Sequence, residues 1–363
     1  MMDLTRREFL SRLAAGLGAL VGGWLLAGCG TEQEPRPSEP PVPPTAPPTA
    51  TATSGAASVP TATVGETAAP TPTTGETAAP SPTEGEGAVA TPTVSADSPD
   101  LVVARGGEPE ELVRRALAAL GGMQRFVGPG YNVIIKPNIC VAYHTYEYAA
   151  TANPWVVGAL VKLCFEAGAG RVRVMDSPFG GTPEEAYVRS GIQKQVLAAG
   201  GQMEIMSSFK FVPTDIPEGR DLRSKYIYDE VLNADLVINV PIAKHHSLAR
   251  LTLGMKNLMG VMTKREAMHS NLGQRLADLT SRVRPALTVV DAVRILVANG
   301  PTGGDLNDVR KLDTVIATPD IVAADSYAAT LFGLQPLDLD YVRAATEMGL
   351  GRSDLGNLRI EEI

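Results

Sequence analysis

The chain has 363 residues, of which 44% are apolar and 20% are charged, and its formal net charge at pH 7 is −8. The negative charge lies in residues 29–100, which carry −8, whereas residues 1–28 carry +1 and residues 101–363 carry only −1. The C-terminal region therefore lacks the basic excess typical of nucleic-acid binding, and its length of about 260 residues is enough for one large core.

The first 28 residues show the order of features found in an exported lipoprotein. The stretch TRREFL, which contains Arg6 and Arg7, looks like a twin-arginine export signal, and a short apolar run follows it. LAGC, which ends at Cys29, resembles a bacterial lipobox, in which cleavage leaves a lipid-bearing cysteine as the new N-terminus. We therefore expect the twin-arginine export machinery as a partner and an extracytoplasmic protein that Cys29 anchors to the bacterial membrane. A single-pass membrane helix is the alternative, although the run is short and Gly-rich for a span of about 20 residues.

Residues 29–100 have the composition of a spacer. They consist mainly of Pro, Thr, Ala, Gly and Ser, and a ten-residue unit recurs as GAASVPTATV, GETAAPTPTT, GETAAPSPTE and GEGAVATPTV. Such a segment cannot bury enough apolar surface to offset the entropy lost on ordering. We predict a disordered stalk rather than a repeat domain.

From residue 101 onward, short apolar segments alternate with segments of helical periodicity. Strands are predicted at 101–105, 132–138, 171–178, 202–208, 234–241, 285–293 and 311–319. Helices are predicted at 109–122, 153–170, from 182 onward, and at 271–283, 320–334 and 340–350. The alternation predicts a single α/β domain over residues 101–363, with a mostly parallel sheet flanked by helices on both faces.

Polar residues gather just beyond the ends of the predicted strands. They are Lys136-Pro137-Asn138, Asp176-Ser177-Pro178, the stretch from Asn239 to His246, Asp291, and GPTGGD at 300–305. Open α/β sheets bind their ligands outside the carboxyl ends of the strands. We therefore expect a site at this edge, with the segment after ADLVINV as one of its loops.

Several of these segments together resemble domain-of-unknown-function family 362. The matching segments are KPNI at 136–139, DSP at 176–178, ADLVINVPIAKHH at 234–246, and GMKNLMG at 254–260 followed by His269. The resemblance extends over nearly all of residues 101–363 and implies an α/β domain whose biochemistry is unsettled. Some relatives carry a ferredoxin-like module with cysteine quartets, which this chain lacks.

The sequence is also faintly similar to the nickel-pincer lactate racemases. In that comparison Lys256 would correspond to the lysine that anchors the organic cofactor, and His269 to a downstream histidine. We expect common ancestry rather than shared chemistry.

The cysteines beyond Cys29 are Cys140 and Cys164. Two are too few for a thiolate iron–sulfur cluster or a structural zinc site, so no iron–sulfur cluster is expected from this chain. A disulfide is the alternative for a protein outside the cytoplasm, but proteins exported by the twin-arginine route normally fold before export. We favour buried thiols.

Lysines and asparagines form the cationic part of the expected site. Three lysine charges beside neutral amides suit a carboxylate or a phosphate, and a desolvated lysine also serves as a base or a Schiff-base nucleophile. The alternative for each lysine is a side chain that extends to solvent. The predicted catalytic residues are Lys256, His245, Asn257 and Lys244, and the predicted binding residues are Lys136, Asn138, Asp176, Gly254, Gly303 and Gly304.

Histidines and carboxylates near the same strand ends suggest a divalent metal such as zinc, iron or nickel. Adjacent histidines on an extended segment point to opposite sides, so we expect only one of His245 and His246 to face the site. The predicted metal set is His245, His269 and Asp176, with Asp291 as a further carboxylate. Hydrogen-bonded core histidines are the alternative, because neither HExxH nor HxH spacing is present.

The Gly-rich GPTGGD loop offers backbone N–H groups to an anion, and a plain turn is the alternative. It matches neither a phosphate-binding P-loop nor a dinucleotide fingerprint, and no G-x-S-x-G elbow occurs. Two functions follow from these patterns. One is a lipid-anchored enzyme that acts on a small anionic molecule, and the other is a binding lipoprotein that holds an anion or metal complex for a transporter or redox partner. A purely structural surface protein would leave the polar strand ends unexplained.

Overall fold

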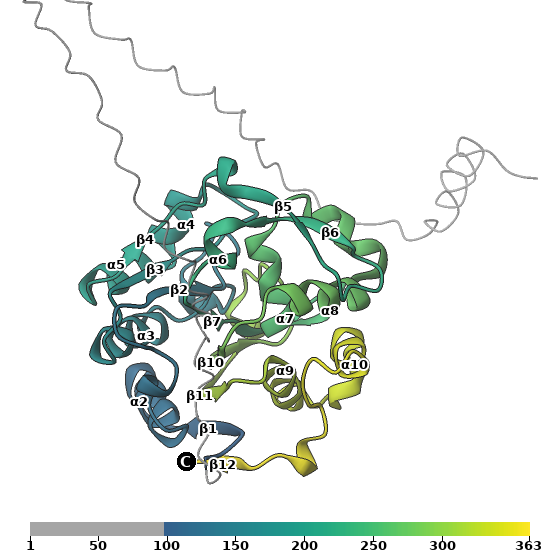
Figure 1. Ribbon diagram of the computed structural model, residues 1–363. Coiled ribbons are helices and arrows are strands. Elements are labelled where there is room, and N and C mark those ends of the chain that lie inside the picture. The colour runs from purple at the N-terminus through teal and green to yellow at the C-terminus, as the bar shows by residue number, and fades with distance from the viewer. Residues whose placement is uncertain (1–97) are drawn as a thin grey trace, which may run out of the picture. The chain divides into compact units, whose positions relative to one another are not determined.

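The structure is a computed structural model that describes residues 98–363 (Figure 1). The predicted export signal, the lipidation site Cys29 and nearly all of the predicted stalk lie outside these residues. Within residues 98–363, no helix has the length and apolar character needed to cross a membrane.

The described chain alternates strands and helices, as the sequence predicts. The strands are β1 (Leu101–Arg105), β2 (Asn132–Pro137), β3 (Arg171–Val174), β4 (Gln202–Met203), β5 (Phe211–Asp215), β6 (Ser224–Tyr228), β7 (Leu236–Val240), β8 (Ile242–His246), β9 (Arg250–Thr252), β10 (Leu287–Leu296), β11 (Val309–Thr318) and β12 (Ile360–Glu362). The helices are α2 (Pro109–Ala119), α3 (Pro154–Glu166), α4 (Pro183–Arg189), α5 (Ile192–Ala198), α6 (Asp229–Leu232), α7 (Gly254–Asn257), α8 (Leu272–Arg282), α9 (Ile321–Thr330) and α10 (Asp340–Glu347).

One large sheet organises the fold, with the strand order β12-β1-β11-β10-β7-β2-β3-β4. From β10 to β4 every neighbouring pair is parallel, whereas β11 runs antiparallel to both β1 and β10. β8 continues beside β10 in parallel and pairs with β9 in an antiparallel hairpin. The predicted mostly parallel α/β sheet is therefore confirmed, with one antiparallel strand inserted near its β12 edge.

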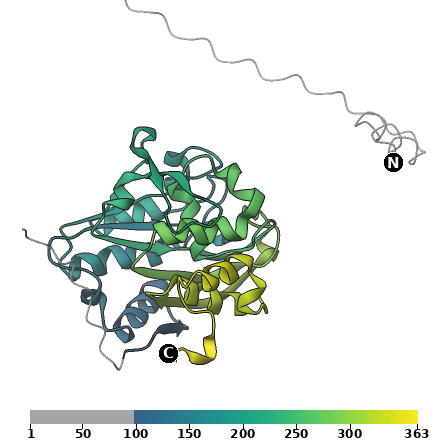
Figure 2. The ribbon, with the colours of Figure 1, turned by 45° about the vertical axis from the view of Figure 1, so that its right-hand side comes forward.

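Helices cover both faces of this sheet. On one face, α2 and α3 pack with Val133, Ile135 and other alternate strand residues into one apolar core. On the other face, α8, α9 and α10 pack with Ile134 and its counterparts into a second core. Figures 1 and 2 show the blue helices on one side of the sheet and the green and yellow helices on the other. Because successive side chains of a strand point to opposite faces, runs such as NVIIK supply both cores at once.

Two helix starts follow local capping chemistry. Asn153 accepts a hydrogen bond from the backbone N–H of Trp155 (3.0 Å), and Pro154 occupies the first position of α3, as expected from the sequence. Thr182 and Glu185 form a reciprocal capping box at the start of α4. These caps fix the first residues of α3, which follows β2 in the chain, and of α4, which follows β3.

Three segments differ from the sequence prediction. The strand expected at 202–208 is limited to β4, and the Glu204 carboxylate just beyond it pairs with Arg173 (2.8 Å). The segment after β7, expected as a loop of the site, contains the β8–β9 hairpin, whose lysine and histidines hide its strand character. A second antiparallel hairpin, β5–β6, was not predicted.

Cys140 and Cys164 are buried free thiols, as favoured from the sequence. Burial raises the pKa of Cys164 to about 12, so this thiol is inert near neutral pH. Cys140 lies closer to the strand ends, where its Sγ is 3.5 Å from the carbonyl oxygen of Pro301.

Candidate functional site

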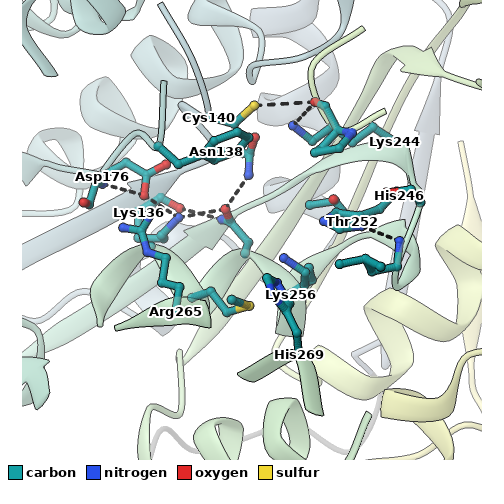
Figure 3. A pocket seen from close by; sticks show the side chains of 18 of the residues that line it. Lys136, Asn138, Cys140, Asp176, Lys244, His246, Thr252, Lys256, Arg265 and His269 are labelled. Atoms are coloured by element: carbon teal, nitrogen blue, oxygen red, sulfur yellow. Dashed lines mark hydrogen bonds and ion pairs between the residues drawn. The ribbon is translucent and has the colours of Figure 1, made fainter. Parts of the chain in front are cut away.

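A cavity of about 500 Å³ opens at the carboxyl ends of β2 and β3, beside the β8–β9 hairpin (Figure 3). This is the edge at which an α/β sheet is expected to bind its ligand. The polar residues that line the cavity are Lys136, Asn138, Asp176, Ser177, Lys244, His246, Ser247, Thr252, Lys256, Asn257, Arg265, Glu266 and His269. Two apolar lining residues, Phe179 and Leu248, are 58% and 63% exposed, so they form an apolar part of the edge where the cavity meets solvent.

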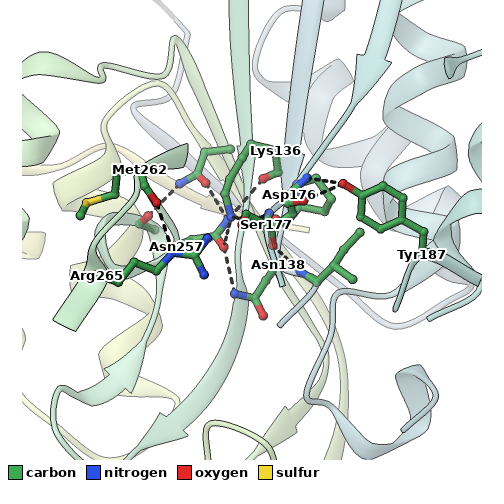
Figure 4. Close-up of polar contacts among 12 residues, drawn as sticks. Lys136, Asn138, Asp176, Ser177, Tyr187, Asn257, Met262 and Arg265 are labelled. Atoms are coloured by element: carbon green, nitrogen blue, oxygen red, sulfur yellow. Dashed lines mark hydrogen bonds and ion pairs between the residues drawn. The ribbon is translucent and has the colours of Figure 1, made fainter. Parts of the chain in front are cut away.

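A buried ion pair lies at the base of the cavity, between Lys136 at the end of β2 and Asp176 after β3. Their Nζ and Oδ1 atoms are 2.8 Å apart, and the two side chains are 1% and 4% exposed (Figure 4). Asp176 also accepts hydrogen bonds from the backbone N–H groups of Ser177 (2.8 Å) and Ile139 (2.6 Å). Burial lowers the pKa of Lys136 to about 8, although the Asp176 charge opposes this effect.

Asn257 connects three elements through both atoms of its amide group. Its Oδ1 accepts hydrogen bonds from Lys136 Nζ (2.7 Å) and Asn138 Nδ2 (2.9 Å). Its Nδ2 donates to Asn239 Oδ1 (2.8 Å) and to the carbonyl oxygen of Lys136 (3.3 Å). All four hydrogen-bonding positions of the amide are occupied, so Asn257 holds the site together and has no polar atom left for a ligand.

The remaining lysines of the cavity differ in how they are held. Lys244 is 1% exposed and donates to the carbonyl oxygens of Ala150 (2.6 Å) and Pro301 (2.9 Å). Lys256, on α7, has no hydrogen-bond or ion-pair partner within residues 98–363. Burial lowers the pKa of Lys256 to about 8, and the nearby charges of Lys244 and Arg265 lower it further. Lys256 is thus the lysine whose amine is available to a ligand.

The histidine that lines the cavity is His246, which corrects the prediction for His245. His246 Nδ1 accepts hydrogen bonds from the backbone N–H groups of Leu248 (3.1 Å) and Ala249 (3.3 Å) in the hairpin turn. Burial, reinforced by Lys256 and Lys244, lowers its pKa to about 3, so the ring is neutral with its proton on Nε2. His245 faces away, and its Nδ1 accepts from the N–H of Gly300 (3.1 Å). The alternation along β8 places Lys244 and His246, rather than His245, on the cavity side.

The glycines predicted to bind a ligand do not line the cavity. Gly254 instead makes room for Asp325, which accepts from the N–H groups of Gly254 (2.6 Å) and Met255 (2.9 Å) at the start of α7. Gly303 and Gly304 lie in a loop that contributes only Pro301 to the cavity lining. The glycine that matters at the cavity is Gly260, where an added Cβ would lie 2.0 Å from Asp176 Oδ1.

The predicted metal set is not brought together. His269 and Asp176 line the cavity, but His245 does not, and Asp176 is already engaged by Lys136. Across the described part of the chain, no three His, Cys, Asp or Glu side chains are grouped so that they could hold a metal ion. Asp291 is also elsewhere, where it accepts from the N–H groups of Asn153 (2.6 Å) and Val293 (3.0 Å), and burial raises its pKa to about 6.

Residues that the sequence prediction missed complete the site. Arg265 begins the 3₁₀ helix Arg265–Asn271, lines the cavity, and donates to the carbonyl oxygen of Met262 (3.4 Å). Thr252 lies on β9 opposite Lys244 and is 4% exposed. Neither residue stands at a predicted strand end, and only the hairpin pairing would have indicated Thr252.

The charged lining is dominated by cations. Lys136, Lys244, Lys256 and Arg265 oppose only Asp176 and the exposed Glu266. Positive charge in a buried setting attracts a compensating anion, because the low dielectric strengthens each interaction. The arrangement favours an anionic ligand with oxygen acceptors.

Comparison with known proteins gives a family and two distant structural likenesses. Thylakoid-associated protein sll1697 of Synechocystis sp. (strain ATCC 27184 / PCC 6803 / Kazusa) is 30% identical over 247 residues, which cover 66% of this chain and 74% of that protein. The lactate racemase apoprotein from Thermoanaerobacterium thermosaccharolyticum aligns with 12% identity and a TM-score of 0.42, over 63% of this chain and 56% of that one. A crystal structure of a Thermotoga maritima protein aligns with 12% identity and a TM-score of 0.38, over 63% and 60% of the two chains.

The family comparison covers the segments that build the cavity. The model of the family described as "Domain of unknown function (DUF362)" matches residues 133–330, a range that includes the cavity lining from Lys136 to Pro301. This range is more than half of the 363 residues. The chain therefore belongs to the DUF362 family.

Proposed function

We propose that the protein is an enzyme that binds a small organic anion in this cavity and transfers a proton to or from it through Lys256. The observation that carries the proposal is the unpartnered Lys256 amine in a cavity lined by three further cations. The volume of about 500 Å³ exceeds the needs of an inorganic ion, and the apolar edge formed by Phe179 and Leu248 suits the organic part of a ligand.

The division of labour among the cations follows from their contacts. Lys136 and Lys244 are fixed by protein oxygens and supply stationary positive charge. Lys256, with a pKa of about 8, is present as both amine and ammonium near neutral pH, which is the condition for efficient proton transfer. Neutral His246 can donate a hydrogen bond from Nε2 without changing its charge.

A binding assay with simple anions tests the proposal. We expect isothermal titration calorimetry to detect phosphate or small hydroxycarboxylates, and we expect Lys256→Met to weaken their binding about tenfold or more. Affinity should also fall as the pH rises past about 8, because Lys136 and Lys256 then lose their charge. The matched control is Lys194→Ala, which removes an exposed lysine on α5.

If Lys194→Ala weakens anion binding as much as Lys256→Met does, the cavity is not the binding site. Catalysis is read separately, by NMR detection of chemical conversion or of solvent deuterium in the bound anion. Binding without any conversion or exchange across a panel of carboxylates would favour the alternative, a binding protein that serves a transporter or a redox partner.

We also propose that the protein works outside the cytoplasm as a membrane-anchored lipoprotein. Arg6, Arg7 and Cys29 support this proposal through their order in the sequence. The Synechocystis relative is described as thylakoid-associated, which agrees with a location at a membrane. The twin-arginine machinery would then export the folded domain, and its ligand would be an anion of the cell envelope or its surroundings.

A further inference from the structure

The orientation of the Asn138 amide is fixed by its neighbours. Asn138 is 7% exposed and donates from Nδ2 to Asn257 Oδ1 (2.9 Å), the same oxygen that accepts from Lys136 Nζ (2.7 Å). A flipped amide would place an oxygen against that oxygen and lose the hydrogen bond. Asn138 Oδ1 therefore points away from Asn257 (Figure 4).

Two polar atoms of the cavity lining are buried and have no hydrogen-bond partner in residues 98–363: Asn138 Oδ1 and Thr252 Oγ1. Their side chains appear on the cavity wall in Figure 3. A buried acceptor left unpaired costs about 1–3 kcal/mol, so native structures normally satisfy such atoms with protein, water or ligand. The Thr252 hydroxyl can either donate or accept, whereas Asn138 Oδ1 can only accept.

We propose that the ligand of this cavity is an anion that also carries a hydroxyl or amine hydrogen, which it donates to Asn138 Oδ1. This inference rests on the proposed function, because the cations select the anion and Asn138 then selects among anions. A carboxylate or sulfate oxygen is acceptor-only, and next to Asn138 Oδ1 it would bring two acceptors together. A site built to receive a donor discriminates strongly against analogues that lack it.

Two matched pairs of probes test the inference by calorimetry on the full-length protein. Hydrogen phosphate and sulfate share size and shape, but only hydrogen phosphate carries an O–H group. Glycolate and methoxyacetate are carboxylates that differ in the same way. We expect the donor-bearing member of each pair to bind about tenfold or more tightly, which is the effect of one satisfied buried acceptor.

Variants assign the preference to its atom. Asn138→Leu should reduce both ratios to near one, whereas the isosteric Thr252→Val should weaken both members of a pair alike and keep their ratio. Lys256→Met should weaken all four probes, and Lys194→Ala should change none. The melting temperature of each variant shows whether it is folded, and equal binding within each pair by the unaltered protein overturns the inference without any variant.

The outcomes separate the two proposals. Equal binding within each pair, with sensitivity to Lys256→Met, overturns the requirement for a donor and leaves an anion site in place. A preference that survives in folded Asn138→Leu also overturns it, because another group must then receive the donor. Failure of all four probes to bind contradicts the anion site itself and the donor requirement with it.

Discussion

Lys136 and Lys256 show how one residue type is treated in two ways within a single cavity. Lys136 has a carboxylate, a carbonyl oxygen and an amide oxygen around its ammonium group, whereas Lys256 has no such partner among the described residues. Burial lowers both pKa values to about 8. The free energy lost by burying charge is thus partly regained from protein partners at Lys136, whereas Lys256, which is only partly buried, regains none from such partners.

Replacing Lys256 with methionine should stabilise the fold near neutral pH. Lowering its pKa from 10.5 to about 8 corresponds to a cost of up to about 3 kcal/mol for the charged form. Below about pH 8 this lysine is charged in both the folded and the unfolded states, so the full cost is present. We expect Lys256→Met to raise the free energy of unfolding, measured with urea, by about 1–3 kcal/mol at pH 7.

The same measurement at higher pH supplies the control. Between about pH 8 and 10.5 the unfolded chain still binds the proton that folded Lys256 has released, so the unaltered protein gains stability with pH. The advantage of Lys256→Met should therefore shrink toward pH 10.5. A variant that is less stable than the parent at both pH values would instead identify Lys256 as a structural part of the core.

At this scale, the sequence predicted residue types better than it predicted their orientations. Lys136, Asn138, Asp176, Lys244 and Lys256 were placed at the cavity because strand ends of a parallel sheet converge at one edge. The structure places His246 rather than His245 at the cavity, because the sequence alone does not show which side of the extended segment faces the site. Asn138 Oδ1 could not be identified as unpaired from the sequence, since that property depends on Asn257 from a distant segment.

Among the elements, the short helix α7 determines where Lys256 and Asn257 lie. The Asp325 carboxylate of α9 receives the first two N–H groups of α7, and burial raises its pKa to about 7. After α7, the backbone at Gly260 lies directly against the Lys136–Asp176 pair. Two glycines, 254 and 260, thus allow α7 and the segment after it to approach two buried carboxylates.

Gly260→Ala should disrupt the base of the cavity. Its Cβ would lie 2.0 Å from Asp176 Oδ1 and 2.5 Å from Lys136 Nζ, so either the ion pair or the backbone must move. Breaking a buried pair costs about 3–5 kcal/mol, and we expect a loss of that order in urea denaturation. Gly356→Ala is the control and should change stability little, because this glycine is exposed and the new Cβ would lie 3.4 Å from Asp354 Oδ1, an ordinary contact distance.

A Gly260→Ala protein as stable as the parent would show that the segment after α7 can shift without loss of stability.

The sequence predicted the regular elements of the fold better than the irregular ones. Long periodic helices such as α3 and α8 and buried strands such as β2 and β7 were predicted, because period and capping identify them locally. The hairpins β5–β6 and β8–β9 were missed, because charged residues mask their alternation and their pairing is set by tertiary contacts.

At the scale of the whole molecule, the α/β domain is expected to function at the end of a lipid-anchored spacer. Its attachment to the membrane would then depend on the lipid carried by a single sulfur atom, that of Cys29. In the native host, Cys29→Ser should move the protein from the washed membrane fraction to the soluble fraction while its melting temperature stays the same. Quantitative immunoblotting of the fractions measures the shift.

Retention of Cys29→Ser in membranes after an alkaline wash would instead indicate that the apolar segment before Cys29 spans the bilayer. Replacing both Arg6 and Arg7 with lysine is the companion control, because it should stop export without altering the lipobox. The two variants separate a failure of export from a failure of lipidation.

The anchoring of Lys136 and Lys244 to protein oxygens has a consequence for the thermodynamics of binding. Each of these side chains is already held in one conformation before a ligand arrives. Its conformational entropy is therefore lost on folding and not on ligand binding. Lys256 is the cavity lysine that still has freedom to lose. A ligand should therefore bind with only a small loss of side-chain conformational entropy, because two of the three lysines do not have to be ordered. Ligands of different shape should be accommodated mainly by movement of the Lys256 side chain.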